Sequence, residues 1–210
     1  MHTIPCVCTF NIRYTRIVMA LSNRMNNKNA EGGGLARKNG MINIREYELV
    51  SLETGAYRDI ELDILKETLA TWKENPGSPF ELIELRDGSI LAGFCLYYRA
   101  PNTDYTFDVH TFVVGRDYQN KAVGPRLVEL LEERLLQSKK YAVIRIETSK
   151  VKENAIGDDF FQSIGFQTIG HIPAFYDADN DYYIYVKAVS TSHPKPDSTG
   201  AGEESAKKDE

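Results

Sequence analysis

The stretch Phe107–Leu136, FDVHTFVVGRDYQNKAVGPRLVELLEERLL, has the residue types and spacing for anion binding. An apolar run is followed by the polar turn Gln119–Gly124 and then by apolar residues at helical spacing. Backbone N–H groups at a helix start have no intrahelical partner, and the helix macrodipole adds positive potential there. Pro125 is tolerated only in a first helical turn, so it places the helix start near Lys121–Val123. The stretch therefore predicts a strand, a turn and a helix whose first turn can hold a phosphate.

Two ionisable side chains precede this turn on the predicted strand. Asp108 and His110 are two residues apart, so they point to the same face of the strand. Asp108 is a candidate general base, with an exposed acid at a strand end as the alternative. His110 is a second candidate, with a packed or hydrogen-bonded histidine as the alternative. Glu84 and Glu147 lie on other predicted strands, either near a site or on the surface.

The elements before this stretch follow from hydrophobic periodicity. Residues 42–47 alternate loosely and are predicted as a first strand. Residues 58–73 carry apolar side chains three and four apart, which predicts a helix. Residues 80–85 and 90–98 are predicted as two strands joined around Asp87-Gly88. This dipeptide is typical of a tight hairpin whose two central residues both have positive φ.

The elements after it complete a mixed sheet. Strands over 105–114 and 141–148, separated by the helix, predict a right-handed crossover and a parallel pair. A short helix capped by Asn154 is expected to end near Ile164, with Gly165 in the left-handed conformation. Two more strands are predicted over 166–172 and 182–189.

Two possible metal motifs are not supported. The turn at residues 177–181, DADND, begins like a calcium loop, but Tyr182 stands in place of the glycine and Ala188 in place of the bidentate glutamate. A solvated hairpin turn is predicted instead. Cys6-x-Cys8 has no second ligand pair at a suitable spacing. No metal cofactor is expected.

Composition limits the class of protein. The 210 residues are 42% hydrophobic and 26% charged, as in ordinary soluble domains. The net charge of -5 and the pI of about 5.5 argue against a broad nucleic-acid surface. The three cysteines are too few and of odd number for a disulfide framework, which favours a reducing compartment and a cytoplasmic location. The apolar run near the N-terminus is interrupted by charges, so no membrane span is expected.

Three segments are predicted. Residues 1–40 carry six Lys and Arg against one acid and include a glycine-rich part, so they are expected to be a disordered extension or a leader unrelated to the fold. Residues 41–189 form the folded domain. Residues 190–210 are Ser, Pro, Gly and charge, and are expected to be a disordered polar tail.

The order of predicted elements, with Gln119-x-x-Ala122-x-Gly124 after an apolar strand, resembles the GNAT superfamily of acetyl-CoA-dependent N-acetyltransferases over residues 42–189. A second stretch, Asn154 followed by Phe160-Phe161-x-x-x-Gly165-Phe166, is similar to the family's N-x-x-A-x-x-F-Y-x-x-x-G-F. The resemblance implies a mixed α/β (α+β) fold with a central, mostly antiparallel sheet of about seven strands flanked by helices. It also implies that two parallel strands splay at the cofactor site, here between 111–114 and 141–148.

The resemblance further implies acetyl-CoA as co-substrate. Backbone N–H groups of the Gln119–Gly124 turn would bind its pyrophosphate, the pantetheine arm would lie along Phe112–Val114, and a backbone N–H near Val114 would stabilise the oxyanion. Lys121 and Arg126 would meet phosphate charge or form a solvated helix face. The cofactor-binding positions implied are Phe112, Val113, Val114, Gln119, Asn120, Lys121, Ala122, Val123, Gly124, Arg126, Asn154 and Phe161.

Two departures from the family pattern bear on function. Ala122 replaces the first glycine of the signature, and we expect it to have a helical φ because Pro125 places the helix start there. Phe161 stands where the family often has a tyrosine that protonates the leaving thiolate. Tyr176 and Tyr183 are candidate substitutes. Asp108 has the spacing of the catalytic carboxylate in histone-acetyltransferase-like members.

The function expected is acetyl transfer from acetyl-CoA to a primary amine of a small molecule, peptide or protein. The acidic domain suggests a cationic acceptor. The alternative, motivated by Phe161, is a coenzyme-A-binding module with little or no turnover. A nucleotide-binding α/β domain is disfavoured because no G-x-G-x-x-G or P-loop motif occurs. We expect no nucleic-acid or membrane partner, and a monomer or homodimer.

Overall fold

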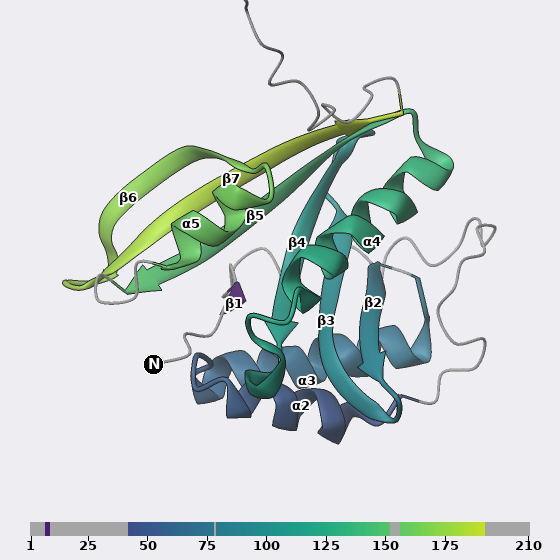
Figure 1. Ribbon diagram of the computed structural model, residues 1–210, viewed down its shortest axis with the longest axis vertical. Coiled ribbons are helices and arrows are strands. Elements are labelled where there is room, and N and C mark those ends of the chain that lie inside the picture. The colour runs from purple at the N-terminus through teal and green to yellow at the C-terminus, as the bar shows by residue number, and fades with distance from the viewer. Residues whose placement is uncertain (1–6, 9–41, 78, 152–155, 192–210) are drawn as a thin grey trace, which may run out of the picture.

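The computed structural model describes residues 7–8, 42–77, 79–151 and 156–191 (Figure 1). The helices are α2 (Ile44–Glu53), α3 (Asp59–Glu74), the 3-10 turn η1 (Arg116–Tyr118), α4 (Val123–Ser138) and α5 (Ile156–Ser163). The strands are β1 (Val7–Cys8), β2 (Phe80–Asp87), β3 (Ile90–Arg99), β4 (Thr106–Val114), β5 (Tyr141–Val151), β6 (Gln167–Asp177) and β7 (Asn180–Ser190). The predicted extension over 1–40 and tail over 190–210 lie largely outside the described residues.

The seven strands form one sheet in the order β2-β3-β4-β5-β7-β6, and β1 pairs with β4. Only β4 and β5 run parallel, and the other pairs are antiparallel. The predicted mixed, mostly antiparallel sheet flanked by helices is therefore confirmed. The strand predicted over residues 42–47 is wrong, because residues 44–53 form α2. Tyr47 and Ser51 are buried four residues apart, a helical period that competes with the loose alternation of that segment.

The predicted splay between the parallel strands is present. The β4–β5 ladder pairs Thr106 with Val143 and ends at Val109 with Ile146, although the strands continue to Val114 and Val151. Strand β5 stays paired with β7 along its whole length. The two halves of the sheet therefore separate beyond Val109, and the free edge of β4 meets β1 instead (Figure 1).

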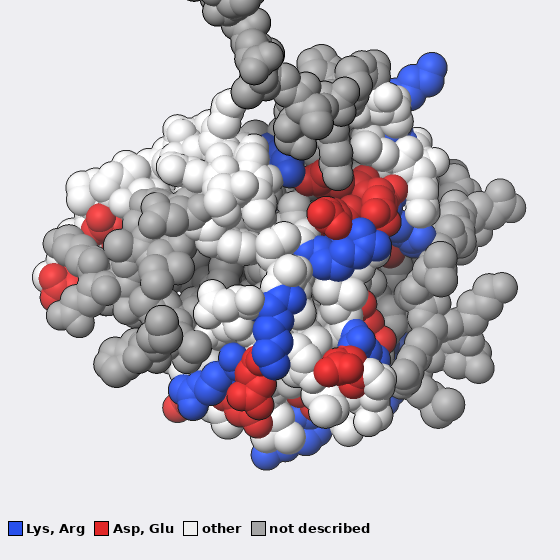
Figure 2. Space-filling view, in the orientation of Figure 1, with Lys and Arg blue, Asp and Glu red and all other residues white. Residues whose placement is uncertain are grey.

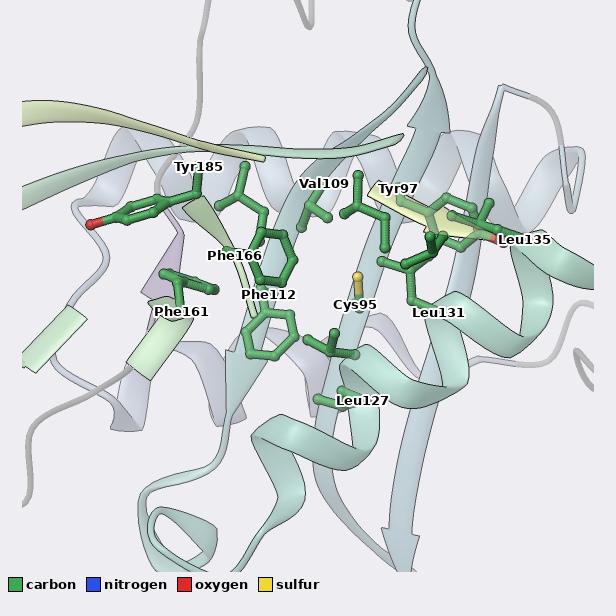
Figure 3. Packing of buried hydrophobic residues seen from close by; sticks show 14 of the residues in the cluster. Cys95, Tyr97, Val109, Phe112, Leu127, Leu131, Leu135, Phe161, Phe166 and Tyr185 are labelled. Carbon is green, nitrogen blue, oxygen red and sulfur yellow. The ribbon is translucent and has the colours of Figure 1, made fainter. Parts of the chain in front are cut away.

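Helices cover both faces of the sheet, and each face has its own hydrophobic cluster. Helix α4 packs on one face, against a cluster that includes Cys95, Val109 and Phe112 (Figure 3). Helices α2 and α3 pack on the other face, where Trp72 is buried. The adjacent Tyr97 and Tyr98 are divided between the two clusters. No helix among the described residues has the length and apolar character needed to cross a membrane.

Both predicted hairpins are confirmed, with one difference in the first. Asp87 pairs with Ile90, so the turn residues of the β2–β3 hairpin are Gly88 and Ser89. Only Gly88 has a positive φ, 59°, so the expectation of two positive values is wrong. The β6–β7 turn closes by pairing Asp177 with Asn180. Helix α5 is followed by Gly165 with φ 90°, as predicted, whereas the cap proposed at Asn154 lies outside the described residues.

Candidate functional site

The segment between β4 and α4, residues 115–122, is called the signature loop below. Its first turn is closed by the Tyr118 N–H, which donates to the Gly115 carbonyl over 2.9 Å, and by the Lys121 N–H, which donates to Tyr118 over 3.2 Å. Helix α4 then begins at Val123, within the range that Pro125 predicts. The first N–H groups of α4 therefore lie at the end of the splayed strand β4.

Ala122 is the N-cap of α4 and has φ 59° and ψ 10°, in the left-handed region. The prediction of a helical φ at Ala122 is wrong, because Pro125 limits where the helix can begin but not the conformation of its cap. Asn120 is also left-handed, with φ 66°. A left-handed alanine costs about 1–2 kcal/mol relative to the right-handed conformation. Turns of this kind direct backbone N–H groups into a concave, anion-binding surface.

Gly124 is required by packing rather than by its φ. A Cβ at this position would lie 2.8 Å from Cζ and 3.1 Å from Cε2 of Phe160 on α5. The Phe160 ring also lies 6.2 Å from that of Phe112 on β4. The second glycine of the signature thus lets the start of α4 approach both α5 and the splayed strand.

Two adjacent side chains in the middle of the signature loop tie it to its surroundings. The Tyr118 hydroxyl donates to Oδ2 of Asp87 at the β2–β3 hairpin over 3.1 Å. The Gln119 amide donates through Nε2 to the Val114 carbonyl over a long 3.5 Å. Its Oε1 is buried and has no hydrogen-bond partner among the described residues. Gln119 therefore ties the loop to β4 and keeps one acceptor for a ligand N–H or O–H.

Two of the cations near the loop, Lys121 and Arg126, already have partners. Arg126 pairs with Glu129 and Glu133, both over 3.0 Å, and these ion pairs raise its guanidinium pKa. The Lys121 ammonium lies 5.2 Å from the centre of the Tyr118 ring. Figure 2 shows Lys and Arg beside Asp and Glu on this face, without one continuous positive patch. Backbone N–H groups are therefore the main candidate anion donors.

A groove of about 590 Å³ adjoins the loop on the side of the β2–β3 hairpin. Arg86, Ala122 and the first turn of α4 are among its walls. This volume is in the range of small-molecule sites.

A second group of functional side chains lies on β4 and β5. Arg145 holds Asp108 with two hydrogen bonds, Nε to Oδ1 and Nη2 to Oδ2, each 2.7 Å. Arg145 also lies 3.5 Å from Oε1 of Glu147. The Asp108 side chain is only 8% exposed, against 31% for Arg145 and 17% for Glu147. The hydrogen bonds to Asp108 raise the guanidinium pKa.

Tyrosines from neighbouring strands border these charges. Burial raises the pKa of Tyr98, which lies beside Asp108, and of Tyr182, which hydrogen-bonds Glu147. Burial also raises the pKa of Tyr176, whose ring centre is 6.3 Å from that of Tyr182. These hydroxyls stay protonated at neutral pH and can donate protons. We call Tyr98, Asp108, Arg145, Glu147, Tyr176 and Tyr182 the polar cluster.

His110 lies on the same face of β4 as Asp108, as predicted, because both adjoin Tyr98. Its Nδ1 is 2.9 Å from the Thr111 hydroxyl, and its ring packs 5.1 Å from Phe80. Burial lowers the His110 pKa to about 3. A buried imidazole of such low basicity is a poor proton acceptor at neutral pH, which fits the packed alternative.

Phe161 is buried in the cluster under α4 and α5. Its ring lies 6.3 Å from Phe112 and 5.0 Å from Tyr185 (Figure 3). Tyr183, one candidate substitute for the missing tyrosine, packs against this same cluster and stacks on Tyr185. Tyr176 lies instead with the charges of β5 and α3. The two candidates therefore lie in different environments, and only Tyr176 belongs to the polar cluster.

Two further predicted positions are placed as follows. Glu84 accepts a hydrogen bond from the Tyr47 hydroxyl and pairs with Arg86 over 3.1 Å, so it joins α2 to β2 away from the polar cluster. Asn154 lies outside the described residues. Within the described ranges, no three His, Cys, Asp or Glu side chains are grouped to hold a metal ion.

The residues that sequence reasoning missed are Arg145, Tyr98 and Tyr182. A signal for Arg145 exists, because it alternates with Ile144 and Ile146 on a strand whose other face is buried. Nothing local indicates that its partner would be Asp108, which is 37 residues away in the chain.

Comparison with known proteins gives a family and a fold. Residues 46–166, more than half of the chain, match the model of the Acetyltransferase (GNAT) family. No curated protein matches the sequence significantly. A solved protein from Desulfovibrio desulfuricans, assigned to the GNAT family, is 22% identical with a TM-score of 0.62, over 69% of this chain and 91% of its own.

Two other solved structures bear on the fold. The ribosomal-protein-S18-alanine N-acetyltransferase from Escherichia coli is 17% identical, with a TM-score of 0.53 over 71% of this chain and 90% of its own. An aminoglycoside 6'-N-acetyltransferase complexed with coenzyme A is 16% identical, with a TM-score of 0.51 over 91% of this chain and 99% of its own. At these identities the likeness concerns the fold.

Proposed function

Because this chain belongs to the GNAT acetyltransferase family, we propose that it transfers the acetyl group of acetyl-CoA to a primary amine by direct attack. One observation carries the proposal. The β4–β5 ladder ends at Val109, so β4 continues without β5 beyond that residue. It leads directly into the signature loop, which ends in the left-handed Ala122, and then into the N-terminus of α4. With β1 displaced, the edge of β4 that β5 leaves can take an amide-bearing arm, and the loop and helix start offer N–H donors for a diphosphate.

The chain's residues have defined tasks in this proposal. Backbone N–H groups at Ala122, Val123 and Gly124 bind the pyrophosphate, and the edge at Phe112–Val114 binds the pantetheine amides. A backbone N–H near Val114 receives the oxyanion that forms as the amine attacks the thioester carbonyl. The C–S bond then breaks, and the sulfur leaves as a thiolate. The buried Oε1 of Gln119, which lacks a partner among the described residues, fits a ligand donor beside this path.

Proton transfer falls to the polar cluster. We assign the proton of the attacking amine to Asp108, and the proton for the departing thiolate to Tyr176. Asp108 is not a free base, because both of its oxygens accept from Arg145. An incoming ammonium would share the carboxylate with the guanidinium. The Tyr176 hydroxyl is protonated at neutral pH and can donate, while the pKa raised by burial makes it a weaker acid than an exposed tyrosine.

The polar cluster also suggests the charge of the acceptor. Two carboxylates, Asp108 and Glu147, face one guanidinium, so the cluster has one negative charge in excess. We propose a cationic acceptor such as an amino sugar, a polyamine or a peptide amine. We further propose cytoplasmic action without nucleic-acid or membrane partners, as a monomer or homodimer.

A thiol-release assay tests the proposal. The protein is incubated with acetyl-CoA and one amine at a time: an aminoglycoside, spermidine, a peptide with an N-terminal alanine and a lysine peptide. Release of coenzyme A above the amine-free rate supports transfer. Asp108→Asn should lower kcat at least tenfold, because general-base catalysis contributes about 10²–10⁴-fold. Tyr176→Phe should lower kcat less, because a thiolate is a fair leaving group.

One observation favours a second candidate, a coenzyme-A-binding module with little turnover. Phe161 is buried among aromatic rings and has no proton to donate. Calorimetric binding of acetyl-CoA without thiol release from any amine would support the module. Absence of acyl-CoA binding would exclude both candidates.

A further inference from the structure

We infer that the chain's own segment Val7–Cys8 occupies the edge of β4 that the pantetheine arm requires, so that this segment and acetyl-CoA exclude one another. The inference rests on the proposed function and adds a regulation of the same site. In Figure 1, β1 lies against β4 in the opening between β4 and β5. Its pairing places Val7 opposite Val113 and Cys8 opposite Phe112.

The edge in question has room for one partner only. A β-strand presents hydrogen-bonding groups on two edges. On one edge of β4, Phe112 pairs with Cys95 and Val113 with Phe94 of β3. On the other edge, β5 is no longer paired after Val109, and β1 takes its place. An arm that adds to β4 as an extra strand at Phe112 and Val113 therefore meets β1.

The contact between β1 and β4 joins two different parts of the chain, which suits a role in regulating coenzyme A binding. Val7 and Cys8 lie outside the family-matched residues 46–166, whereas Phe112 and Val113 lie inside them. The segment therefore contacts the family-matched part of the domain from outside it. Within the described residues the pairing is two residues long, which is short enough for a ligand to displace it.

The backbone nature of the pairing defines the variants to test. Proline has no N–H and does not fit an internal ladder position. In the full chain, Val7→Pro with Cys8→Pro should weaken the pairing. The matched control, Val7→Thr with Cys8→Ser, changes both side chains but keeps both N–H groups. Calorimetry with coenzyme A then compares the three proteins.

We expect the proline variant to bind coenzyme A about threefold or more tightly than the wild type, because apparent Kd rises as the open fraction falls. The control should match the wild type. Equal Kd values in the wild type and the proline variant would overturn the inference. Failure of all three proteins to bind coenzyme A would instead overturn the proposed function.

Hydrogen exchange tests the same exclusion in the wild-type protein, so its result does not depend on any substitution. Saturating coenzyme A should increase exchange at the Val7 and Cys8 amides while β4 stays protected at Phe112 and Val113. Unchanged exchange at Val7 and Cys8, with coenzyme A bound, would overturn the exclusion.

A peptide supplies the same contact in trans. A synthetic peptide of residues 1–12 should inhibit the proline variant competitively against coenzyme A, and a peptide with proline at both positions should not. Inhibition by both peptides, or by neither, would show that strand pairing on β4 is not the cause.

Discussion

The signature loop and the polar cluster both adjoin β4, yet they are built in opposite ways. The loop is one continuous segment, residues 115–122, and its functional groups are backbone N–H groups directed by the φ values of Asn120 and Ala122. The polar cluster combines side chains of five strands, and its central contact joins Asp108 to Arg145. The loop therefore depends on conformation and close packing, whereas the cluster depends on charge pairing.

This difference predicts how each region fails. A change of side chain at the loop matters most where a Cβ has no space or φ is positive. A change in the cluster matters because removing one partner leaves a poorly solvated charge behind. The following substitutions separate the two behaviours.

The largest effect on ligand binding is expected at Gly124. Gly124→Val places side-chain atoms against Phe160, which a Cβ alone would approach to 2.8 Å, and shifts the start of α4. We expect this shift to remove two of the charge-assisted hydrogen bonds from backbone N–H groups to the diphosphate. Coenzyme A should then bind roughly a hundredfold more weakly. Calorimetry measures the change, and circular dichroism checks the fold. Adding Phe160→Ala should recover part of the affinity. Unchanged affinity in the single variant would show that the helix start does not bind the diphosphate.

The next effect is expected in the polar cluster. Arg145→Gln leaves the Asp108 carboxylate, only 8% exposed, without its ion-pair partner. The free energy of unfolding should fall by about 3 kcal/mol. This value is the lower end of the range for breaking a buried ion pair, chosen because Arg145 is partly exposed. Urea unfolding measures it. The double variant with Asp108→Asn should be more stable than the single one. The reverse order would contradict a structural ion pair.

His110 should make stability depend on pH. In the unfolded chain its imidazole binds a proton below about pH 6.5, whereas burial lowers the folded pKa to about 3. The unfolded state therefore binds more protons between these values, and stability falls as the pH falls. The loss is about 1.4 kcal/mol per pH unit in this window.

His110→Gln removes this titration. Urea unfolding from pH 7 to pH 4 should show a flatter profile for the variant than for the wild type. Parallel profiles would mean that His110 is protonated to the same degree in both states.

The smallest effect is expected from replacing the two left-handed alanines with glycine. Ala122, with φ 59°, lies at the loop, and Ala174, with φ 50°, lies on β6. Glycine relieves the strain of the left-handed conformation at either position, but it also increases the entropy of the unfolded chain. Because the first effect is the larger, each substitution should raise the free energy of unfolding by about 0.5 kcal/mol. Thermal unfolding measures it. Ala142→Gly on β5 is the control and should destabilise.

Only Ala122→Gly should change the Kd for coenzyme A, because Ala174 lies on the side of the polar cluster. An equal change in Kd at both positions would contradict the separation of the two regions.

Much of the fold could be predicted from local pattern. The helix at residues 59–74, the start of α4 and both hairpins follow from periodicity, proline and turn residues. Apart from the φ values of the first hairpin turn, two predictions failed, both where local signals conflict. Residues 44–53 alternate loosely but bury Tyr47 and Ser51 on a helical period. Ala122 is left-handed although alanine favours the helical region, because the surrounding fold determines its conformation.

The sequence by itself determined the strand, turn and helix around Gln119–Gly124, since these depend on residues close together in the chain. The tertiary structure decided which distant groups meet: Arg145 with Asp108, Phe161 with Tyr185, and Val7 with Val113. Such contacts depend on strand order and register, which no local pattern specifies. The loop could therefore be identified before the fold was known, and its partners only afterwards.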